Sequence, residues 1–192
     1  TFVHCPGLKV LAPATPYDAK GLLISAIRDD DPVIFCENKL LYDTKGSVPE
    51  ESYSIPLGQA DIKRTGEDVT IVAMSRMVLV ALEAADELAS RGIESEVVDL
   101  RSLSPWDEQT LVDSIEKTGR LVVIDEDNPR CSMASDVAAL AATQALPYLD
   151  APVSMITPPH TPVPFSPPLE DFYVPDAARV VSNIESMFAT AS

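Results

Sequence analysis

The chain has 192 residues, of which 46% are hydrophobic, and a formal net charge of −16 at pH 7. This length and composition predict one domain, or one domain with an appended part, and enough apolar side chain for a core. The negative charge disfavours nucleic-acid binding, which needs basic residues against phosphates, and it disfavours anionic membrane surfaces. It suits a basic protein partner or serves only solubility, and both interpretations stay open.

The three cysteines, Cys5, Cys36 and Cys131, are odd in number and far apart in the sequence. None belongs to a C-x-x-C motif, so neither a disulfide framework nor a zinc site is predicted. Free thiols suit a reducing cytoplasm, which is the expected location. No apolar run approaches the roughly 20 residues that a membrane helix needs, and the pattern of a signal peptide is missing.

Residues 8–36 predict one βαβ unit. Two short apolar runs, 8–12 and 33–36, are typical of buried strands. Between them, Thr15 supplies a cap hydroxyl and Pro16 a proline at the first helical position, so a helix is expected from there to about Arg28. Two strands are too little sheet to be stable alone, so this unit is expected to belong to a larger domain.

After a connector at residues 38–58, strands and helices alternate, which predicts a mostly parallel sheet covered on both faces. Strands are expected at 60–64, 69–73, 96–100, 121–125 and 153–157. Helices are expected at 77–88, from a cap-then-proline start at Ser104-Pro105-Trp106-Asp107 to Gly119, at 133–146 and from Pro175-Asp176 onward. The strands at 60–64 and 69–73 flank a short turn and are predicted to pair as a hairpin. Residues 158–168 contain six prolines, which predicts an irregular loop with a functional or interface role.

Motifs for self-contained chemistry are missing from the sequence: it has no G-x-G-x-x-G, no P-loop and no G-x-S-x-G elbow. With only two histidines, a site with several histidine ligands is excluded. His160, in the proline-rich loop, is either an acid or base or an ordinary exposed histidine, and the second interpretation is preferred. His4 is interpreted as structural.

Two acidic clusters follow predicted elements. The carboxylates at 125–127 suit a metal ion or proton transfer, or they only cap the next helix, which is preferred. Arg130 beside them is interpreted as their ion-pair partner, and Cys131, with no base nearby in the sequence, as inert. The turn at 29–31 follows a helix end whose free carbonyls could join its carboxylates in holding a cation, or it is a plain charged turn.

Four stretches together resemble one protein family. They are HCPGLKVLAPATPYDAKGLLISAIRDDDPVIF, EVVDLRSLSPWD, VVIDEDNPRCSMASDVAAL and DAPVSMITPPHTPVPFSPPLEDFYVP. The chain is similar, over essentially its whole length, to the beta subunit of the thiamine-diphosphate-dependent first component of 2-oxo acid dehydrogenase complexes, a group that includes acetoin dehydrogenase. Many relatives are glycine-rich where this chain has CSMA at 131–134. The sequence stretches CSMASD and HTPVPFSPP resemble the acetoin type more than the other members of the group.

The resemblance implies an α/β fold. Residues 1–42 would be the last βαβ unit of a pyrimidine-binding domain, residues 43–58 a linker, and residues 59–192 a transketolase C-terminal-type domain with a mostly parallel sheet between helices. The family's activating glutamate and active-site histidine would lie upstream. No catalytic or cofactor-binding residue is therefore assigned here, and His4 is no match for that histidine.

The resemblance also implies ligands and partners. Thiamine diphosphate and magnesium would bind in the complete heterotetramer with an alpha subunit and a second beta subunit. A potassium ion would bind at Ala26, Ile27, Asp29 and Asp31. The aspartate of a D-A-P turn, Asp150, would dock the basic subunit-binding domain of the lipoyl acyltransferase.

Two functions follow from the resemblance. The chain is expected to be part of an enzyme subunit that decarboxylates a 2-oxo acid, or cleaves acetoin, and acylates a lipoyl group. This chain alone is expected to be inactive. The alternative is a non-catalytic assembly module that only dimerises and docks the acyltransferase core. The sequence leaves open the substrate, and whether the chain is a truncated, cleaved or naturally split beta subunit.

Overall fold

The computed structural model describes residues 1–190, and the chain divides into two compact units. Unit 1 comprises residues 1–61, 74–76 and 99–107, and unit 2 comprises residues 62–73, 77–98 and the chain from 108 onward. Short segments of the later chain therefore belong to the same unit as the N-terminus. The division predicted from the sequence, at residues 42 and 58, stays a prediction.

Unit 1 contains a three-stranded sheet in the order β2-β1-β6. Its elements are β1 (Lys9–Leu11), α1 (Pro16–Arg28), β2 (Val33–Phe35), the short 3-10 helix η1 (Lys39–Leu41) and β6 (Ser102–Ser104). β1 and β2 pair in parallel with Lys9 opposite Val33, which confirms the predicted βαβ unit. β6 pairs with β1 in the antiparallel direction.

The start of α1 is fixed by a reciprocal cap. The main-chain N–H of Asp18 donates to Thr15 Oγ1 at 3.1 Å, and that hydroxyl donates to Asp18 Oδ2 at 2.6 Å. The buried face of α1 then packs Leu22 against Leu11 and Ile55. Gly21 is needed at this contact, because a Cβ there would lie 2.6 Å from the Ile55 side chain. The sequence therefore sets both the start and the packing of this helix.

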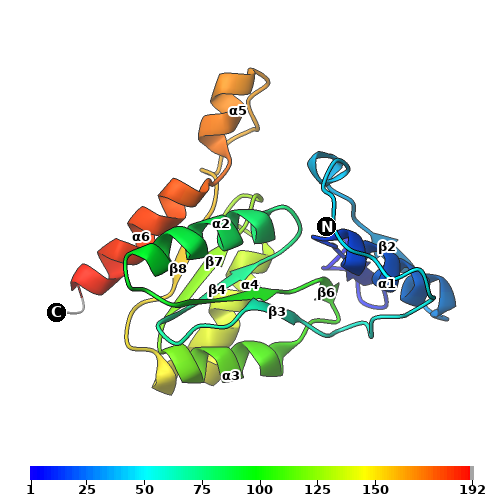
Figure 1. Cartoon of the computed structure of the whole chain (residues 1–192), viewed down its shortest axis with the longest axis horizontal. Helices are drawn as coiled ribbons and strands as arrows, with labels where there is room; N and C mark the ends of the chain where they lie inside the picture. Colours follow the sequence, from blue (N-terminus) through cyan, green and yellow to red (C-terminus); the bar gives the residue numbers. More distant parts are fainter. Residues whose placement is uncertain (191–192) are drawn as a thin grey trace. The chain divides into compact units, whose positions relative to one another are not determined.

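Unit 2 is a five-stranded sheet in the order β3-β5-β4-β7-β8 with helices on both sides. The strands are β3 (Asp61–Arg64), β4 (Val69–Ala73), β5 (Ser95–Asp99), β7 (Leu121–Ile124) and β8 (Ser154–Ile156). β4 with β7, and β7 with β8, pair in parallel. The helices are α2 (Met77–Ser90), α3 (Glu108–Thr118), α4 (Met133–Leu140) and α6 (Ala177–Thr190). α2 and α6 pack together on one face of the sheet, and α3 and α4 cover the other (Figure 1).

The centre of unit 2 is formed by two mostly apolar strands, β4 and β7. Every residue of β4 and β7 is buried, as expected for strands covered on both faces. The one hydroxyl in β4, on Thr70, is satisfied by Ser114 and Thr118 of α3, each with its side-chain oxygen 2.7 Å away. A polar group inside the core therefore fixes how α3 lies on the sheet.

The predicted hairpin is wrong, because β5 lies next to β3 and separates it from β4. Residues 65–68 cross the start of β5 instead of folding back. Glu67 and Asp68 donate their main-chain N–H groups to the carbonyl of Glu94, at 3.1 and 2.9 Å. Gly66 lies against the Ser95 main chain, where a Cβ would come within 2.2 Å. Residues 65–68, which suggested a hairpin turn, therefore form the segment that passes closely over the main chain at the start of β5.

Three other elements differ from the sequence prediction. Ser104 ends β6 and does not cap a helix, since α3 begins only at Glu108. The helix predicted to run to residue 146 keeps α-geometry to Leu140, then widens into a π-helical turn, η2 (Ala141–Ala145), and ends in η3 (Leu146–Tyr148). An unpredicted short helix, α5 (Pro167–Tyr173), follows the proline-rich loop.

Two chain-wide expectations have a structural counterpart. Within residues 1–190, no helix combines the length and the apolarity needed to cross a bilayer. The three cysteines are free thiols, and each of them is exposed.

Candidate functional site

The first candidate site is the turn that follows α1 in unit 1, where an ammonium group lies between two carboxylates. Lys9 Nζ is 2.7 Å from both carboxylate oxygens of Asp29 and 3.0 Å from Asp31 Oδ2. Asp31 also donates its main-chain N–H to Asp29 Oδ1 at 2.9 Å. The hydrogen bond to Lys9 holds the pKa of Asp29 below its usual range, and the same bond raises the pKa of Lys9. The turn is therefore fixed by charge.

The other two residues predicted for potassium belong to the last turn of α1. Ala26 packs against the apolar cluster of unit 1, and the side chain of Ile27 is exposed. Their carbonyls lie where a helix leaves acceptors without intrahelical partners. The four predicted residues thus share one short stretch of chain, with Lys9 already paired to both carboxylates. The potassium site stays a prediction.

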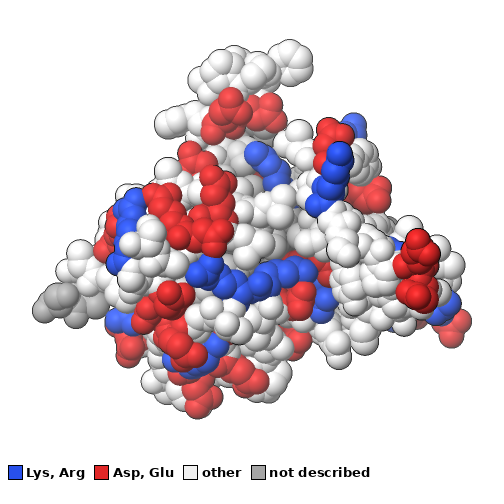
Figure 2. Space-filling view, viewed as in Figure 1, with Lys and Arg blue, Asp and Glu red and all other residues white. Residues whose placement is uncertain are grey.

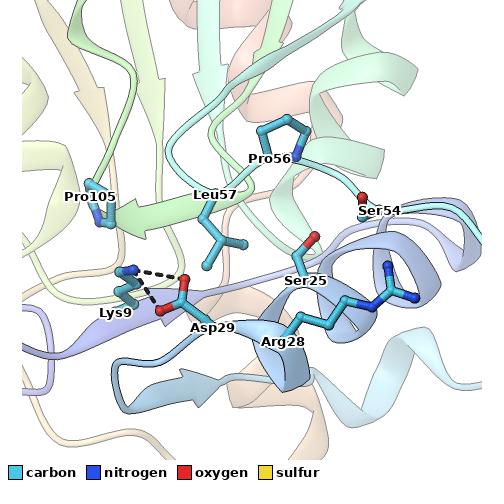
Figure 3. Close-up of a pocket in the computed structure, with 8 residues that line it drawn as sticks. All are labelled: Lys9, Ser25, Arg28, Asp29, Ser54, Pro56, Leu57 and Pro105. Carbon is cyan, nitrogen blue, oxygen red and sulfur yellow. Dashed lines mark hydrogen bonds and ion pairs between the residues drawn. The ribbon is translucent and has the colours of Figure 1, made fainter.

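A polar pocket of about 390 Å³ adjoins this turn, and all of its lining belongs to unit 1. Its lining residues are Lys9, Ser25, Arg28, Asp29, Ser54, Pro56, Leu57 and Pro105. Figure 3 shows the Lys9–Asp29 pair along one side of the pocket. The hydroxyl of Ser25 donates a hydrogen bond to the carbonyl of Ile55 at 2.6 Å. The pocket therefore offers charge but no nucleophile paired with a base.

The second candidate site is the edge of the unit 2 sheet where β7 and β8 end. Asp125, directly after β7, is buried and accepts the main-chain N–H groups of Asp127 at 3.0 Å and Ala134 at 3.3 Å. Burial raises the pKa of Asp125, and those hydrogen bonds offset part of the effect. Asp125 thus closes the turn and holds the start of α4, as the preferred interpretation of this cluster expected.

His160 joins the loop after β8 to the loop after β7. Its Nδ1 lies 2.8 Å from Asn128 Oδ1, which also accepts the main-chain N–H of Arg130 at 3.2 Å. Because the amide oxygen only accepts, Nδ1 is the protonated ring nitrogen in this contact. His160 is exposed, and its hydrogen bond ties two loops together. Cys131, nearby, has a positive φ of 54° and an exposed side chain.

The predicted docking residue, Asp150, directly precedes the strand β8. It therefore lies at the opposite end of the parallel strands from Asp125, which follows β7. Its main-chain N–H donates to the carbonyl of Gly119 at 2.8 Å. Its side chain is 67% exposed, and Oδ2 is 4.0 Å from Arg120 Nη1. The Arg120 guanidinium is in turn stacked over the ring of Phe188, 4.5 Å from its centroid. The main chain of Asp150 is therefore fixed by a hydrogen bond, while its carboxylate is only loosely paired.

Comparison with known proteins assigns the family. The model of the transketolase C-terminal domain matches residues 58–180, and that of the transketolase pyrimidine-binding domain matches residues 1–45. The chain belongs to the transketolase family. The resemblance and the fold class predicted from the sequence are both confirmed.

Two curated relatives place the chain more narrowly within the transketolase family. It is 60% identical over 181 residues to the acetoin:2,6-dichlorophenolindophenol oxidoreductase subunit beta of Cupriavidus necator, covering 94% of this chain and 54% of the relative. It is 51% identical over 162 residues to the pyruvate dehydrogenase E1 component subunit beta of Bacillus subtilis, covering 84% of this chain and 50% of the relative. The chain is thus similar to the beta subunits of acetoin- and pyruvate-type dehydrogenases, and it spans about half the length of the curated relatives it matches.

A solved structure shares the whole fold. It is described as "Split gene transketolase, inactive beta4 tetramer", and it matches with a TM-score of 0.79 and 25% identity, covering 100% of this chain and 60% of that chain. Transketolases of Pichia stipitis match with a TM-score of 0.65 at 14% identity, which is a likeness of fold. The transketolase architecture therefore extends across both units.

Sequence reasoning missed Lys9 as a partner of the acidic turn. The signal was available: in a βαβ unit, the start of the first strand and the turn before the second strand lie at the same end of the parallel pair. Arg101 was also missed. It has a positive φ of 54° and is buried, and its guanidinium lies 3.3 Å from buried Asp18 and donates to the carbonyl of Ala60 at 2.8 Å. No local pattern marks that pairing.

Proposed function

We propose that this chain is the C-terminal part of the beta subunit of a thiamine-diphosphate-dependent acetoin dehydrogenase. With its upstream half and an alpha subunit, it would cleave acetoin and pass the resulting acyl group to the lipoyl group of an acyltransferase core. The observation that carries the choice of substrate is the higher identity to the acetoin-type subunit, 60%, than to the pyruvate-type subunit, 51%. Pyruvate or a branched 2-oxo acid is the other substrate class.

The residues of this chain do not by themselves fit thiamine diphosphate and its magnesium ion. Among residues 1–190, no three His, Cys, Asp or Glu side chains gather as a metal site would require. The ammonium group of Lys9 is already paired with Asp29 and Asp31, so it is not a free cation for a diphosphate. The cofactor therefore belongs, in this proposal, to the complete assembly.

Within that assembly, the chain would contribute docking surfaces. The relatives are named as beta subunits, which implies an alpha subunit as partner. We assign Asp150 to the acyltransferase subunit-binding domain, supported by its exposed and loosely paired carboxylate. A second beta subunit and a cytoplasmic location complete the proposed setting, and the three exposed free thiols suit that location.

A potassium ion at Ala26, Ile27, Asp29 and Asp31 is the structural part of the proposal. The turn that follows α1 has two carboxylates and the helix-end carbonyls that such an ion prefers. Lys9 balances part of the negative charge, so a monovalent ion suits the turn better than a divalent one. The ion would stiffen the turn that leads into β2.

We also propose that the chain alone is inactive, and the matching split-gene transketolase is likewise described as an inactive tetramer of beta chains. The test uses the full-length beta subunit with and without its alpha subunit. Dye reduction by acetoin that requires alpha subunit, beta subunit and thiamine diphosphate together is the expected result. An alpha–beta complex of correct mass that binds the acyltransferase but reduces no dye with acetoin, pyruvate or branched 2-oxo acids would favour the assembly-module alternative.

A further inference from the structure

The pocket of unit 1 beside the acidic turn is lined by two basic side chains in different states. Lys9 is saturated by two carboxylates, those of Asp29 in the lining and of Asp31 outside it. Arg28 belongs to the last turn of α1 and is exposed. Within residues 1–190, its guanidinium has no hydrogen bond and no ion pair. Arg28 is therefore the charged side chain of this lining that is open to a ligand.

The open polar groups of the pocket call for a ligand that accepts hydrogen bonds. Ser25 is already used, because its hydroxyl bonds to the carbonyl of Ile55. The hydroxyl of Ser54 is exposed and has no partner within the described residues 1–190. Figure 3 shows Arg28 and Ser54 across the pocket from the Lys9–Asp29 pair. A guanidinium only donates, and its planar fork matches a carboxylate or a phosphate, so the ligand should be an anion.

The rest of the lining decides between a carboxylate and a phosphate. Pro56, Leu57 and Pro105 are apolar, and Leu57 packs against the apolar cluster of unit 1. The volume of about 390 Å³ is within the range of small-molecule sites, which combine an apolar lining with a few polar groups. An inorganic phosphate has no apolar part to place against these three residues. A carboxylate on a short aliphatic chain uses both the guanidinium and the apolar lining.

The walls of the pocket are held in place before any ligand arrives. The bond from Ser25 to Ile55 joins α1 to the segment that carries Ser54, Pro56 and Leu57. On the other side, the hydroxyl of Ser104 donates to the carbonyl of Leu8 at 3.2 Å, which joins the residues beside Pro105 to the start of β1. A ligand therefore meets a formed lining, which lowers the entropy cost of binding.

The charge of the whole chain makes this pocket an exception. The net charge is −16, and Figure 2 shows acidic side chains spread over the visible face. Such a surface disfavours anions in general, so an anion needs a specific cation to bind. We propose that the unit 1 pocket binds a short aliphatic carboxylate, with its carboxylate on Arg28 and Ser54 and its chain against Pro56, Leu57 and Pro105. The proposal does not depend on the proposed function, because it uses unit 1 residues alone.

The test measures butyrate binding to the full-length beta subunit that contains this chain, by calorimetry without alpha subunit or thiamine diphosphate. We expect a dissociation constant of about 1 mM, which a ligand of this size can reach. Acetate should bind at least about fivefold more weakly, since each buried methylene contributes roughly fourfold. Butyramide, which lacks the charge, and inorganic phosphate, which lacks the chain, should each bind at least about tenfold more weakly than butyrate.

Three variants, each checked for folding by its melting temperature, locate the site. Arg28→Gln should weaken butyrate binding at least about tenfold, because it removes a charged hydrogen-bond donor. Arg28→Lys should fall between that variant and the wild type, since it keeps the charge but loses the planar fork. Arg130→Gln, at an exposed site of unit 2, is the matched control and should bind butyrate as the wild type does.

Three results would overturn the carboxylate site. They are unchanged butyrate binding in a folded Arg28→Gln variant, phosphate binding as tight as that of butyrate, and a folded wild type that does not bind butyrate well above the expected dissociation constant. The last result would be obtained if the upstream half of the subunit fills the pocket. None of these results bears on acetoin cleavage, so failure of this proposal is distinguishable from failure of the proposed function.

Discussion

Lys117 of α3 and Glu96 of β5 form an ion pair whose carboxylate is inside unit 2. Glu96 is buried, Lys117 Nζ contacts its Oε2, and Ser114 donates its hydroxyl to Oε1 at 2.6 Å. Both oxygens of a buried carboxylate are thus satisfied from one helix. Because an unpaired charge in a core is expensive, this pair helps to fix the position of α3 on the sheet.

We predict that Lys117→Met lowers the free energy of unfolding by about 3 kcal/mol, because it leaves the Glu96 carboxylate buried without its cation. This is at the lower end of the usual range because the Lys117 side chain is one-third exposed and water replaces part of the contact. The measurement is urea unfolding followed by circular dichroism. Glu116→Gln, on the exposed face of the same helix, is the control and should change stability by less than about 0.5 kcal/mol. A Lys117→Met variant as stable as that control would contradict the prediction.

A second prediction concerns the pH dependence of stability at Asp125. Burial raises its pKa above the unfolded value of about 3.9, so the folded state binds the proton more tightly than the unfolded state does. Ionisation of Asp125 therefore costs stability above that pKa, and the cost is absent below it. Asp125→Asn should gain stability relative to the wild type as the pH rises from about 4 to 7. Urea unfolding at pH 4, 5.5 and 7 measures this, and a gap that narrows or reverses with rising pH would sink the idea.

A third prediction concerns the potassium site. In the full-length subunit, replacing potassium by tetramethylammonium at equal ionic strength should lower the melting temperature, because the larger cation cannot enter the turn at 29–31. An ion present at 100 times its dissociation constant stabilises by about 2.7 kcal/mol. Asp31→Asn should remove most of this dependence, while Asp43→Asn, an equal charge change at an exposed site of unit 1, should keep it. Equal melting temperatures in both salts would argue against a bound ion.

The fourth prediction tests the docking role of Asp150. Asp150→Ala should weaken binding of the acyltransferase subunit-binding domain by about 2–5 kcal/mol if its carboxylate is desolvated against a Lys or Arg of that domain. A rim contact would lose only about 0.2–1 kcal/mol. Calorimetry at low salt measures the difference, with Glu116→Ala as the charge-matched control on the same unit. Binding that is equal in the wild type and in Asp150→Ala would remove this assignment.

Local chemistry predicted most elements of the fold but not their neighbours. The Thr15 cap and the apolar runs of β4 and β7 are local signals, and all three elements are where the sequence placed them. Strand pairing depends on contacts distant in the sequence, so the turn-like residues 65–68 did not reveal that β5 lies between β3 and β4. The sequence did not reveal α5, because its first two residues, Pro167 and Pro168, were counted with the proline-rich loop. Proline is also common in the first turn of a helix.

The candidate sites were predictable only where one stretch of chain builds them. The acidic turn that follows α1 and Asp150 were both singled out from their own residues and the family resemblance, and their roles stay predictions. The partners Lys9 and Arg120 were not found, because each reaches its carboxylate from another element. The pocket beside Arg28 was likewise invisible in the sequence, since its lining comes from four separate segments of the chain.

The most direct test of the proposed function is the substrate preference of the reconstituted enzyme. Purified alpha subunit and full-length beta subunit, with thiamine diphosphate and magnesium, are assayed for dye reduction with acetoin, pyruvate and branched 2-oxo acids. We predict a kcat/KM for acetoin at least about tenfold above that for any 2-oxo acid, which corresponds to about 1.4 kcal/mol of transition-state discrimination. A preference for pyruvate or a branched 2-oxo acid in the assembled complex would contradict this assignment.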